Sequence, residues 1–312
     1  MAEKGRAKGS SNFINGKNIL RKWDIIFVIA MLAIPVIHFC VFWIYINANS
    51  IMMAFQIPSG KWSWDSFRAV FMNIKAGEGV GNDSLVLAIR NTLIFFFTNL
   101  LIIPFHILIA YFLYRRIKGF KVFQIIFYLP AIVSGVAVTE MFRQFIAPDG
   151  PLGVMLTNMG VETIPHFLAN SDYAIWTILV YTLWLGWGGH MLLLGGALAR
   201  VPVEILESAR VDGITTPKEI VYMICPLIWP TVSTLLILQM TTLFSASGPI
   251  LLFTGGDFKT TTLGFWIFAK VKYGGSAMYN QVAAAGLLFT LIGMPLILGA
   301  RGLIEQIPVV DY

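Results

Sequence analysis

Residues 201–226 read VPVEILESARVDGITTPKEIVYMICP and form a charged stretch between two long apolar runs. With Arg200, the stretch carries four acidic and three basic residues. A plain connection between two helices needs only a few polar residues. The stretch therefore predicts a structured segment that the protein presents to a soluble partner.

The rest of the chain has the composition of an integral membrane protein. Of its 312 residues, 57% are hydrophobic and only 12% are charged, with a mean hydropathy of +0.76. Soluble domains carry about 25% charged residues. Lys and Arg outnumber Asp and Glu by 22 to 16, but the excess lies in loops on one side of the membrane, so we expect no nucleic-acid partner.

Six apolar runs are long enough to cross a bilayer core of roughly 30 Å. The predicted spans are 25–46, 92–114, 122–142, 173–198, 220–244 and 282–300. The predicted fold class is all-α, a polytopic membrane protein with six transmembrane helices. We divide the chain into an N-terminal segment 1–24, a six-helix domain 25–300 and a tail 301–312, and we expect no cleaved signal peptide.

The basic residues predict the orientation of the spans. If the N-terminus is cytoplasmic, then 115–121, 200–219 and the tail share its side, and 14 of the 22 basic residues lie inside. Cytoplasmic loops are enriched in Lys and Arg. Both termini are therefore expected in the cytoplasm, and 47–91, 143–172 and 245–281 outside.

The first half of the charged stretch predicts a short helix over 203–211. Pro202 suits the start of a helix, where the missing N–H is not needed. One face of this helix is apolar. Its members are Ile205, Leu206 and Ala209. A helix with an apolar and acidic face is expected to dock into a groove of another protein.

A turn and a second helix follow. Gly213 can adopt the left-handed conformation that ends helices. Thr216 is the expected N-cap of the next helix, with Pro217 in its first turn and Glu219 completing a capping box. This second helix leads into the fifth span.

The loop resembles the E-A-A-x-x-D-G…P loop of permease subunits of binding-protein-dependent ABC importers. The matching residues are Glu207-Ser208-Ala209, Asp212-Gly213 and Pro226. Two further segments narrow the resemblance to the maltose and glycerol-phosphate type. They are Trp184-Leu185-Gly186 and Thr254-Gly255-Gly256 with the threonines at 260–262. The sequence departs from the pattern at Ser208, Ile214 and Asp257.

The resemblance implies a type I ABC importer permease in the cytoplasmic membrane of a bacterium or archaeon. The loop at about 200–219 would be a cytoplasmic coupling helix that docks into an ATPase. The implied docking residues are Glu207, Ser208, Ala209, Asp212 and Gly213. The implied partners are a second homologous permease, two ATPase subunits that hold ATP and Mg²⁺, an extracytoplasmic solute-binding protein, a carbohydrate solute and membrane lipid.

Polar and aromatic residues at membrane depth are the candidate solute contacts, since sugars bind through hydrogen bonds and aromatic faces, and polar groups in lipid are costly unless used. Leu185 and Gly186 are implied by the resemblance. The other candidates are Trp184, Trp187 and His190, which could share one helical face, and Gln239, Thr242 and Ser245. Helix packing and interhelical hydrogen bonding are the alternative roles for these residues.

Three alternatives remain: an ABC permease for a non-sugar solute, an ion-coupled carrier working alone, and a membrane enzyme. A carrier needs paired intramembrane acids, and only Glu140 approaches the membrane interior, where Arg143 can neutralise it. The chain lacks G-x-x-x-x-G-K-[ST], H-E-x-x-H and G-x-S-x-G. We therefore predict no catalytic, cofactor or metal site in it.

Overall fold

The computed structural model describes residues 22–307. Most of the predicted N-terminal segment 1–24, and 308–312 of the predicted tail, lie outside the described residues. The chain divides into two compact units, Met1–Met52 and Met53–Tyr312. Within 22–307 every regular element is helical, apart from one isolated antiparallel bridge between Gln56 and Trp62. The predicted all-α class is confirmed.

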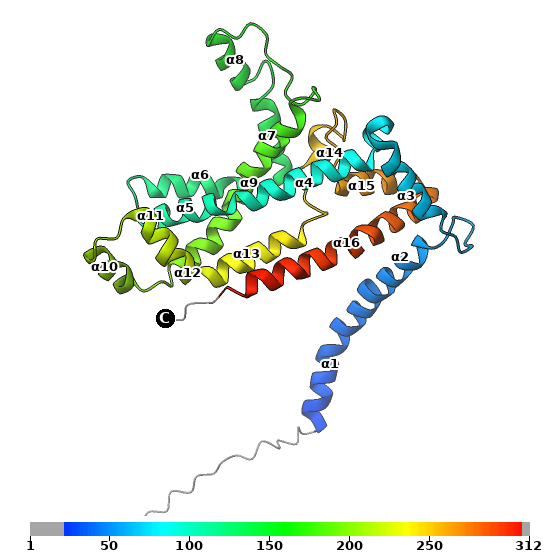
Figure 1. Cartoon of the computed structure of the whole chain (residues 1–312), viewed down its shortest axis with the longest axis horizontal. Coiled ribbons are helices and arrows are strands. Elements are labelled where there is room, and N and C mark those ends of the chain that lie inside the picture. Colours follow the sequence, from blue (N-terminus) through cyan, green and yellow to red (C-terminus); the bar gives the residue numbers. More distant parts are fainter. Residues whose placement is uncertain (1–21, 308–312) are drawn as a thin grey trace, which may run out of the picture. The chain divides into compact units, whose positions relative to one another are not determined.

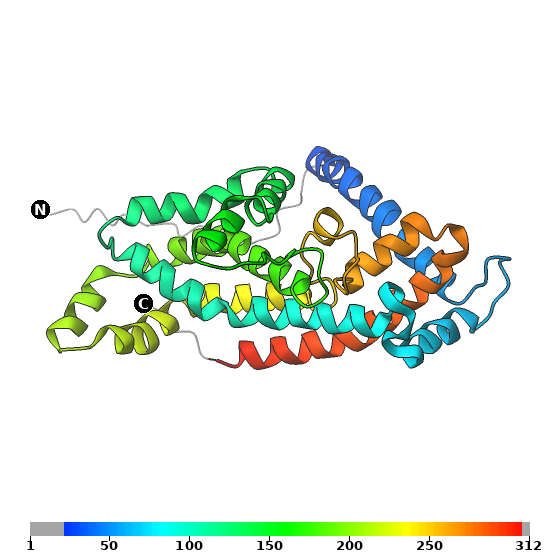
Figure 2. The same cartoon turned by 90° about the horizontal axis from the view of Figure 1, so that it is seen from above.

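The described part of the chain contains sixteen α-helices, joined by short π- and 3₁₀-helical turns (Figures 1 and 2). They are α1 (Lys22–Phe39), α2 (Ile46–Ala54), α3 (Asp65–Ala76), α4 (Leu85–Leu101), α5 (Ile103–Tyr114), α6 (Phe120–Ile132), α7 (Gly135–Phe145), α8 (Pro151–Asn158), α9 (Ala174–Leu198), α10 (Val203–Val211), α11 (Thr216–Glu219), α12 (Cys225–Leu227), α13 (Trp229–Thr241), α14 (Ile250–Phe253), α15 (Leu263–Tyr273) and α16 (Tyr279–Glu305).

Four continuous helical runs are long and apolar enough to cross a membrane. These are Ile25–Ala54, Leu85–Tyr114, Ala174–Leu198 and Ser276–Glu305. The other two predicted spans are bent pairs, α6 with α7 at 112° and α11–α12 with α13 at 77°. The six predicted positions hold when each bent pair counts as one span, and the two bent spans, 122–142 and 220–244, both contain proline.

The bend between α6 and α7 falls at Val133 and Ser134, whose ψ angles of 152° and 126° are extended rather than helical. Pro130 lies within the last turn of α6. Proline cannot donate the backbone hydrogen bond that an uninterrupted helix needs, which weakens the helix at this point.

The second bend falls at Ile228, between Pro226 and Pro230. Pro230 lies in the first turn of α13, where a missing N–H costs least. Pro226 lies near the end of the continuous helical run Thr216–Leu227, where proline weakens the helix. The two prolines therefore flank the point at which the span divides into two helices.

Helix α9 is the centre of the second unit and packs against α4, α5, α6 and α13. At Gly188 an added Cβ would lie 2.7 Å from Cβ of Ala131 and 3.0 Å from the carbonyl oxygen of Phe127. The other glycines of 186–196 face open space. The close helix approach that small residues permit therefore occurs between α9 and α6, at Gly188.

Candidate coupling helix and solute pathway

Helix α10 spans Val203–Val211, as the sequence predicts. Gly213 follows two residues after the end of this helix, and its φ of +79° lies in the left-handed region. The N–H of Ile214 donates to the carbonyl oxygen of Ala209 at 3.1 Å, so the end of the helix is closed by a backbone hydrogen bond. The predicted glycine stop is confirmed.

The apolar face of α10 packs against the protein's own helices. Leu206 is 2% exposed and belongs to a buried cluster that includes Tyr111, Leu198 and Ile224. Ala209 is also buried. Burying this face stabilises α10 without a partner. The expectation that the apolar face needs a groove in another protein was therefore wrong, because α5, α9 and the start of the fifth span already cover it.

The opposite face of α10 is free for a partner. Exposed residues on it and at its end are Val203, Glu204, Glu207, Ser208, Val211, Asp212 and Gly213. Val211 is 88% exposed. The hydroxyl of Ser208 donates to the carbonyl oxygen of Ile205 at 3.0 Å, which turns it back toward its own helix. Of the predicted docking residues, only Ala209 lies on the covered side.

An ion pair ties α10 to the helix that follows. Arg210 Nη2 lies 2.9 Å from Glu219 Oε1, and Arg210 Nε donates to Oε2 at 3.3 Å. The hydrogen bond to this carboxylate raises the pKa of Arg210. The predicted capping box is wrong. Thr216 is the first residue of α11 rather than its N-cap, and Thr215, at the N-cap, makes no side-chain hydrogen bond there. The carboxylate of Glu219 bonds Arg210 instead of a backbone N–H at the start of the helix.

The end of α5 is also hydrogen-bonded to α11. Arg115 Nη1 donates to the hydroxyl of Tyr111 at 3.1 Å and to Oγ1 of Thr216 at 3.5 Å. The ends of α5, α10 and α11 are thus connected by side-chain hydrogen bonds, and the loop 200–219 is attached to two spans. A displacement of α10 would be transmitted to both.

Among the candidate solute contacts, the structure brings Gly186, His190 and Gln239 together. His190 Nδ1 lies 3.0 Å from the carbonyl oxygen of Gly186, and His190 Nε2 lies 3.1 Å from Gln239 Nε2. A carbonyl oxygen only accepts, so Nδ1 carries the proton and Nε2 accepts from the amide of Gln239. This contact joins α9 to α13 at membrane depth.

The two tryptophans lie in separate aromatic clusters. Trp184 faces Phe142 and Tyr181, with ring centroids 6.2 and 6.1 Å away. Trp187 instead faces Phe127 at 5.0 Å. Each step of three residues along a helix turns the side-chain direction by roughly 60°. Trp187 also faces His106 of α5, at 6.3 Å, and the ring of His106 stacks on that of His190. Trp187 and His190 therefore share a neighbour, whereas Trp184 faces a different group of aromatic side chains.

The remaining candidates lie around these residues. Leu185 is half-buried and packs against the cluster that contains Phe95 and Tyr181. Thr242 Oγ1 donates to the carbonyl oxygen of Gln239 at 2.8 Å. Ser245 is exposed and lines a cavity of about 400 Å³ between α13, α15 and α16. Thr242 therefore lies next to the contact between Gln239 and His190. Ser245 lines a cavity to which neither of those two residues contributes.

His106 on α5 is a residue that the sequence-based prediction missed. Its ring stacks on that of His190, with centroids 4.7 Å apart and planes 18° from parallel, and only 1% of the residue is exposed. Neither ring nitrogen of His106 has a hydrogen-bond partner within residues 22–307, and nor does Trp187 Nε1. An ionisable residue inside an apolar span was the available signal.

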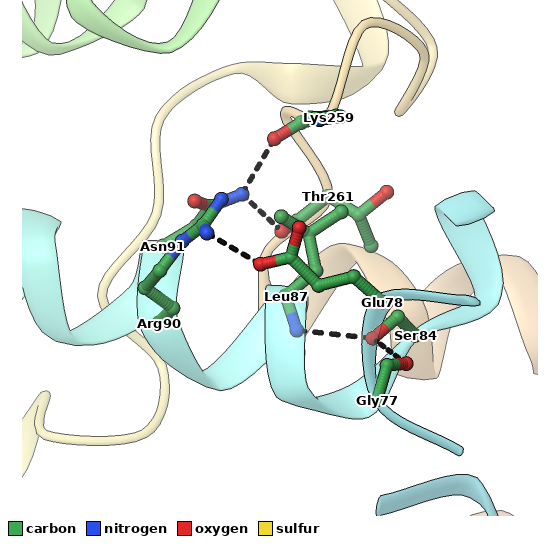
Figure 3. Close-up of polar contacts among 8 residues, drawn as sticks. All are labelled: Gly77, Glu78, Ser84, Leu87, Arg90, Asn91, Lys259 and Thr261. Atoms are coloured by element: carbon green, nitrogen blue, oxygen red, sulfur yellow. Dashed lines mark hydrogen bonds and ion pairs between the residues drawn. The ribbon is translucent and has the colours of Figure 1, made fainter. Parts of the chain in front are cut away.

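The Thr-Gly-Gly loop is held by α4. Figure 3 shows Asn91 donating to the carbonyl oxygens of Lys259 and Thr261, each at 2.8 Å. Within the loop, Thr261 Oγ1 donates to the carbonyl oxygen of Gly256 at 2.9 Å. At the start of α4, Ser84 accepts from the N–H of Leu87 at 3.2 Å. The loop is therefore fixed to the second span rather than free.

Comparisons with known proteins give a consistent set of relatives, although the chain matches no family model. The probable ABC transporter permease protein YesP of Bacillus subtilis is 29% identical over 154 residues, 49% of this chain and 50% of YesP. The multiple sugar-binding transport system permease protein MsmF of Streptococcus mutans is 29% identical over 191 residues, 60% of this chain and 65% of MsmF. The matches thus span about half to two thirds of these relatives.

One solved structure resembles the fold over nearly its whole length. A chain of a bacterial ABC transporter involved in import of the acidic polysaccharide alginate superposes with a TM-score of 0.77 at 24% identity. The match covers 91% of the present chain and 98% of that one. The two chains therefore share the same helical fold.

Proposed function

We propose that this chain, a homologue of the permease proteins of ABC sugar importers, is a membrane-spanning subunit of an ATP-driven importer for a carbohydrate. The resemblance predicted from the E-A-A-type loop is confirmed by the sugar-transport relatives. They support a multi-pass membrane protein whose role is transport. The carbohydrate itself, the partners and the orientation belong to the proposal.

The observation that supports the coupling role is that α10 has one buried side and one exposed side. Its apolar side is buried in the protein, while Glu204, Glu207 and Asp212 face outward. An ATPase would dock on that acidic face, and its closure would move α10 together with the attached ends of α5 and α11. In this arrangement both termini are cytoplasmic, and ATP and Mg²⁺ are bound by the ATPase subunits.

The assembly we propose contains a second homologous permease, two ATPase subunits and an extracytoplasmic solute-binding protein. The bacterial alginate ABC transporter, which has the same fold, forms a complex with an alginate pentasaccharide-bound periplasmic protein. For the solute, the polar group made by His190, Gln239 and His106 beside Trp187 is the best-supported contact region. Hydrogen bonds beside an aromatic ring suit a sugar.

Uptake in reconstituted vesicles tests the coupling role. Glu207→Lys reverses the charge at the centre of the exposed face and is expected to abolish ATP-coupled uptake while membrane insertion persists. Glu162→Lys makes the same charge change at an exposed residue of the predicted outer segment and serves as the control. Full uptake by the Glu207→Lys variant would disprove docking through this face.

The alternative of an ion-coupled carrier makes a different prediction, uptake without any ATPase. Arg143 Nη2 lies 3.0 Å from Glu140 Oε2, so the one acid predicted near the membrane interior is paired. An uptake assay with the purified chain alone, under an imposed proton or sodium gradient, separates the two functions. Uptake there would refute the importer assignment.

A further inference from the structure

A polar cavity of about 360 Å³ is lined by residues of α5, α6 and α9 and by Arg116 of the turn at 115–121. Gly195 and Gly196 of α9 leave it open, since a Cβ at either position would meet nothing within 4 Å. The polar side chains that line it are Tyr114, Arg116, Gln124 and Tyr128. The cavity therefore offers hydrogen-bond donors and a positive charge at the end of three membrane helices.

An apolar furrow of about 480 Å³ lies along α6. Phe120, Gln124 and Tyr128 line both the cavity and the furrow, so the two are adjacent. Beyond them the furrow is lined by Lys121 at one end and by Ile125, Leu129 and Ile132 further along the helix. A polar cavity and an apolar furrow thus lie side by side at this end of α6.

The turn beside the cavity carries four basic residues within seven positions. They are Arg115, Arg116, Lys118 and Lys121. Arg115 is held by the hydrogen bonds described above. The side chains of the other three make no hydrogen bond or ion pair with any residue of 22–307. Their positive charge is therefore not compensated by an ion pair within residues 22–307.

The backbone of this turn is strained at the residue that lines the cavity. Arg116 has a φ of +52°, in the left-handed region that non-glycine residues avoid. Gly119, three residues later, also has a positive φ of +82°. A strained non-glycine residue is evidence for a local function. Here the strained residue is the arginine that lines the cavity.

We propose that this surface is a binding site for one anionic phospholipid. Arg116 and Lys121 bind the phosphate, Gln124 and Tyr128 donate hydrogen bonds to headgroup oxygens, and an acyl chain lies along α6 over Ile125 and Leu129. Basic pockets between membrane helices suit anionic headgroups, and charge-assisted hydrogen bonds to phosphate are strong. A free phosphate would use the cavity but leave the furrow empty. The site goes beyond the proposed transport function and does not depend on it.

Native mass spectrometry of the full-length chain in detergent tests the site. The chain is titrated with phosphatidylglycerol and, separately, with phosphatidylcholine of the same acyl chains. We expect a bound phosphatidylglycerol to be retained in preference to phosphatidylcholine. A nearby basic residue contributes about fivefold to the binding of an anionic lipid, so Arg116→Gln, Lys118→Gln and Lys121→Gln together should weaken retention about 100-fold.

A matched control removes three positive charges elsewhere. Lys61→Gln, Lys75→Gln and Lys272→Gln alter exposed lysines on the predicted outer segments and should leave phosphatidylglycerol retention unchanged. Gly196→Leu fills the cavity without changing charge and should also lower retention. Circular dichroism and gel filtration of each variant verify that it is folded, so that loss of lipid reflects the site.

Several results would overturn the proposal. One is equal retention of the two lipids, and another is unchanged phosphatidylglycerol retention in the folded triple variant. Displacement of the lipid by millimolar inorganic phosphate would show a site for a soluble anion. A photoreactive amino acid at Ile125, activated in native membranes, should give a lipid adduct. A protein adduct there would show that a partner covers the furrow instead.

Discussion

Replacing Arg210 is expected to loosen the coupling helix far more than replacing its partner Glu219. The side chain of Glu219 is 2% exposed, whereas that of Arg210 is 39% exposed. Arg210→Gln leaves a buried carboxylate without its cation, which costs about 3–5 kcal/mol in a fully buried pair. Partial access of water to this pair places the expected cost near the lower end, about 3 kcal/mol.

The reverse change leaves a group that water can reach. Glu219→Gln exposes the guanidinium of Arg210 to solvent and retains an amide oxygen that accepts a hydrogen bond from it. The expected cost is therefore about 1 kcal/mol. The two variants thus remove the same ion pair with unequal consequences, because only one of the two charges is buried.

Hydrogen exchange of the detergent-purified chain measures this difference. Amides of 203–219 exchange their hydrogens through local opening of the structure. The exchange rate should increase about 100-fold in Arg210→Gln and about fivefold in Glu219→Gln, because about 1.4 kcal/mol corresponds to a tenfold change. Arg68→Gln breaks an exposed pair with Asp65 and is the control. Equal exchange in the two variants, or faster exchange in Glu219→Gln, would refute the reasoning.

Three further predictions concern the spans and the outer loop. Gly188→Ala should lower stability by about 1–3 kcal/mol in thermal unfolding, because its Cβ would lie 2.7 Å from Ala131, whereas Gly189→Ala, with nothing within 4 Å, should not. Asn91→Ala leaves two carbonyl oxygens unpaired and should cost about 2–3 kcal/mol, seen as faster proteolysis at 254–262; unchanged cleavage would contradict it. Gln239→Leu removes the hydrogen bond to the α9 histidine and should raise the KM for carbohydrate uptake about tenfold, and an unaltered KM would assign that contact to helix packing.

Local features of the sequence were enough to predict much of the fold. Apolar run length located all six spans, because a bilayer requires helices of a set length. The helix over 203–211 and its end at Gly213 were also predictable, since both depend on residues close together in the chain. The loop motif identified the relatives for the same reason, as its residues lie within twenty positions.

The candidate sites depended on contacts between distant parts of the chain. The sequence placed Trp184, Trp187 and His190 at regular spacing, but which neighbours each one meets is set by how α5, α6 and α13 pack around α9. His106 became a candidate only because α5 places its ring against His190, 84 positions along the chain. Spacing along one helix carries no information about the helix that lies opposite.

By itself, then, the sequence determined the class of protein, the positions of the spans and the exposed acidic helix, because these follow from hydrophobic length and local backbone preference. Tertiary structure decided which face of α10 is available and where its charges are held. Glu219 has the spacing of a capping box, yet its carboxylate bonds Arg210 instead. A buried carboxylate is stabilised more by a guanidinium than by a backbone N–H, and only the folded chain brings that guanidinium within 2.9 Å.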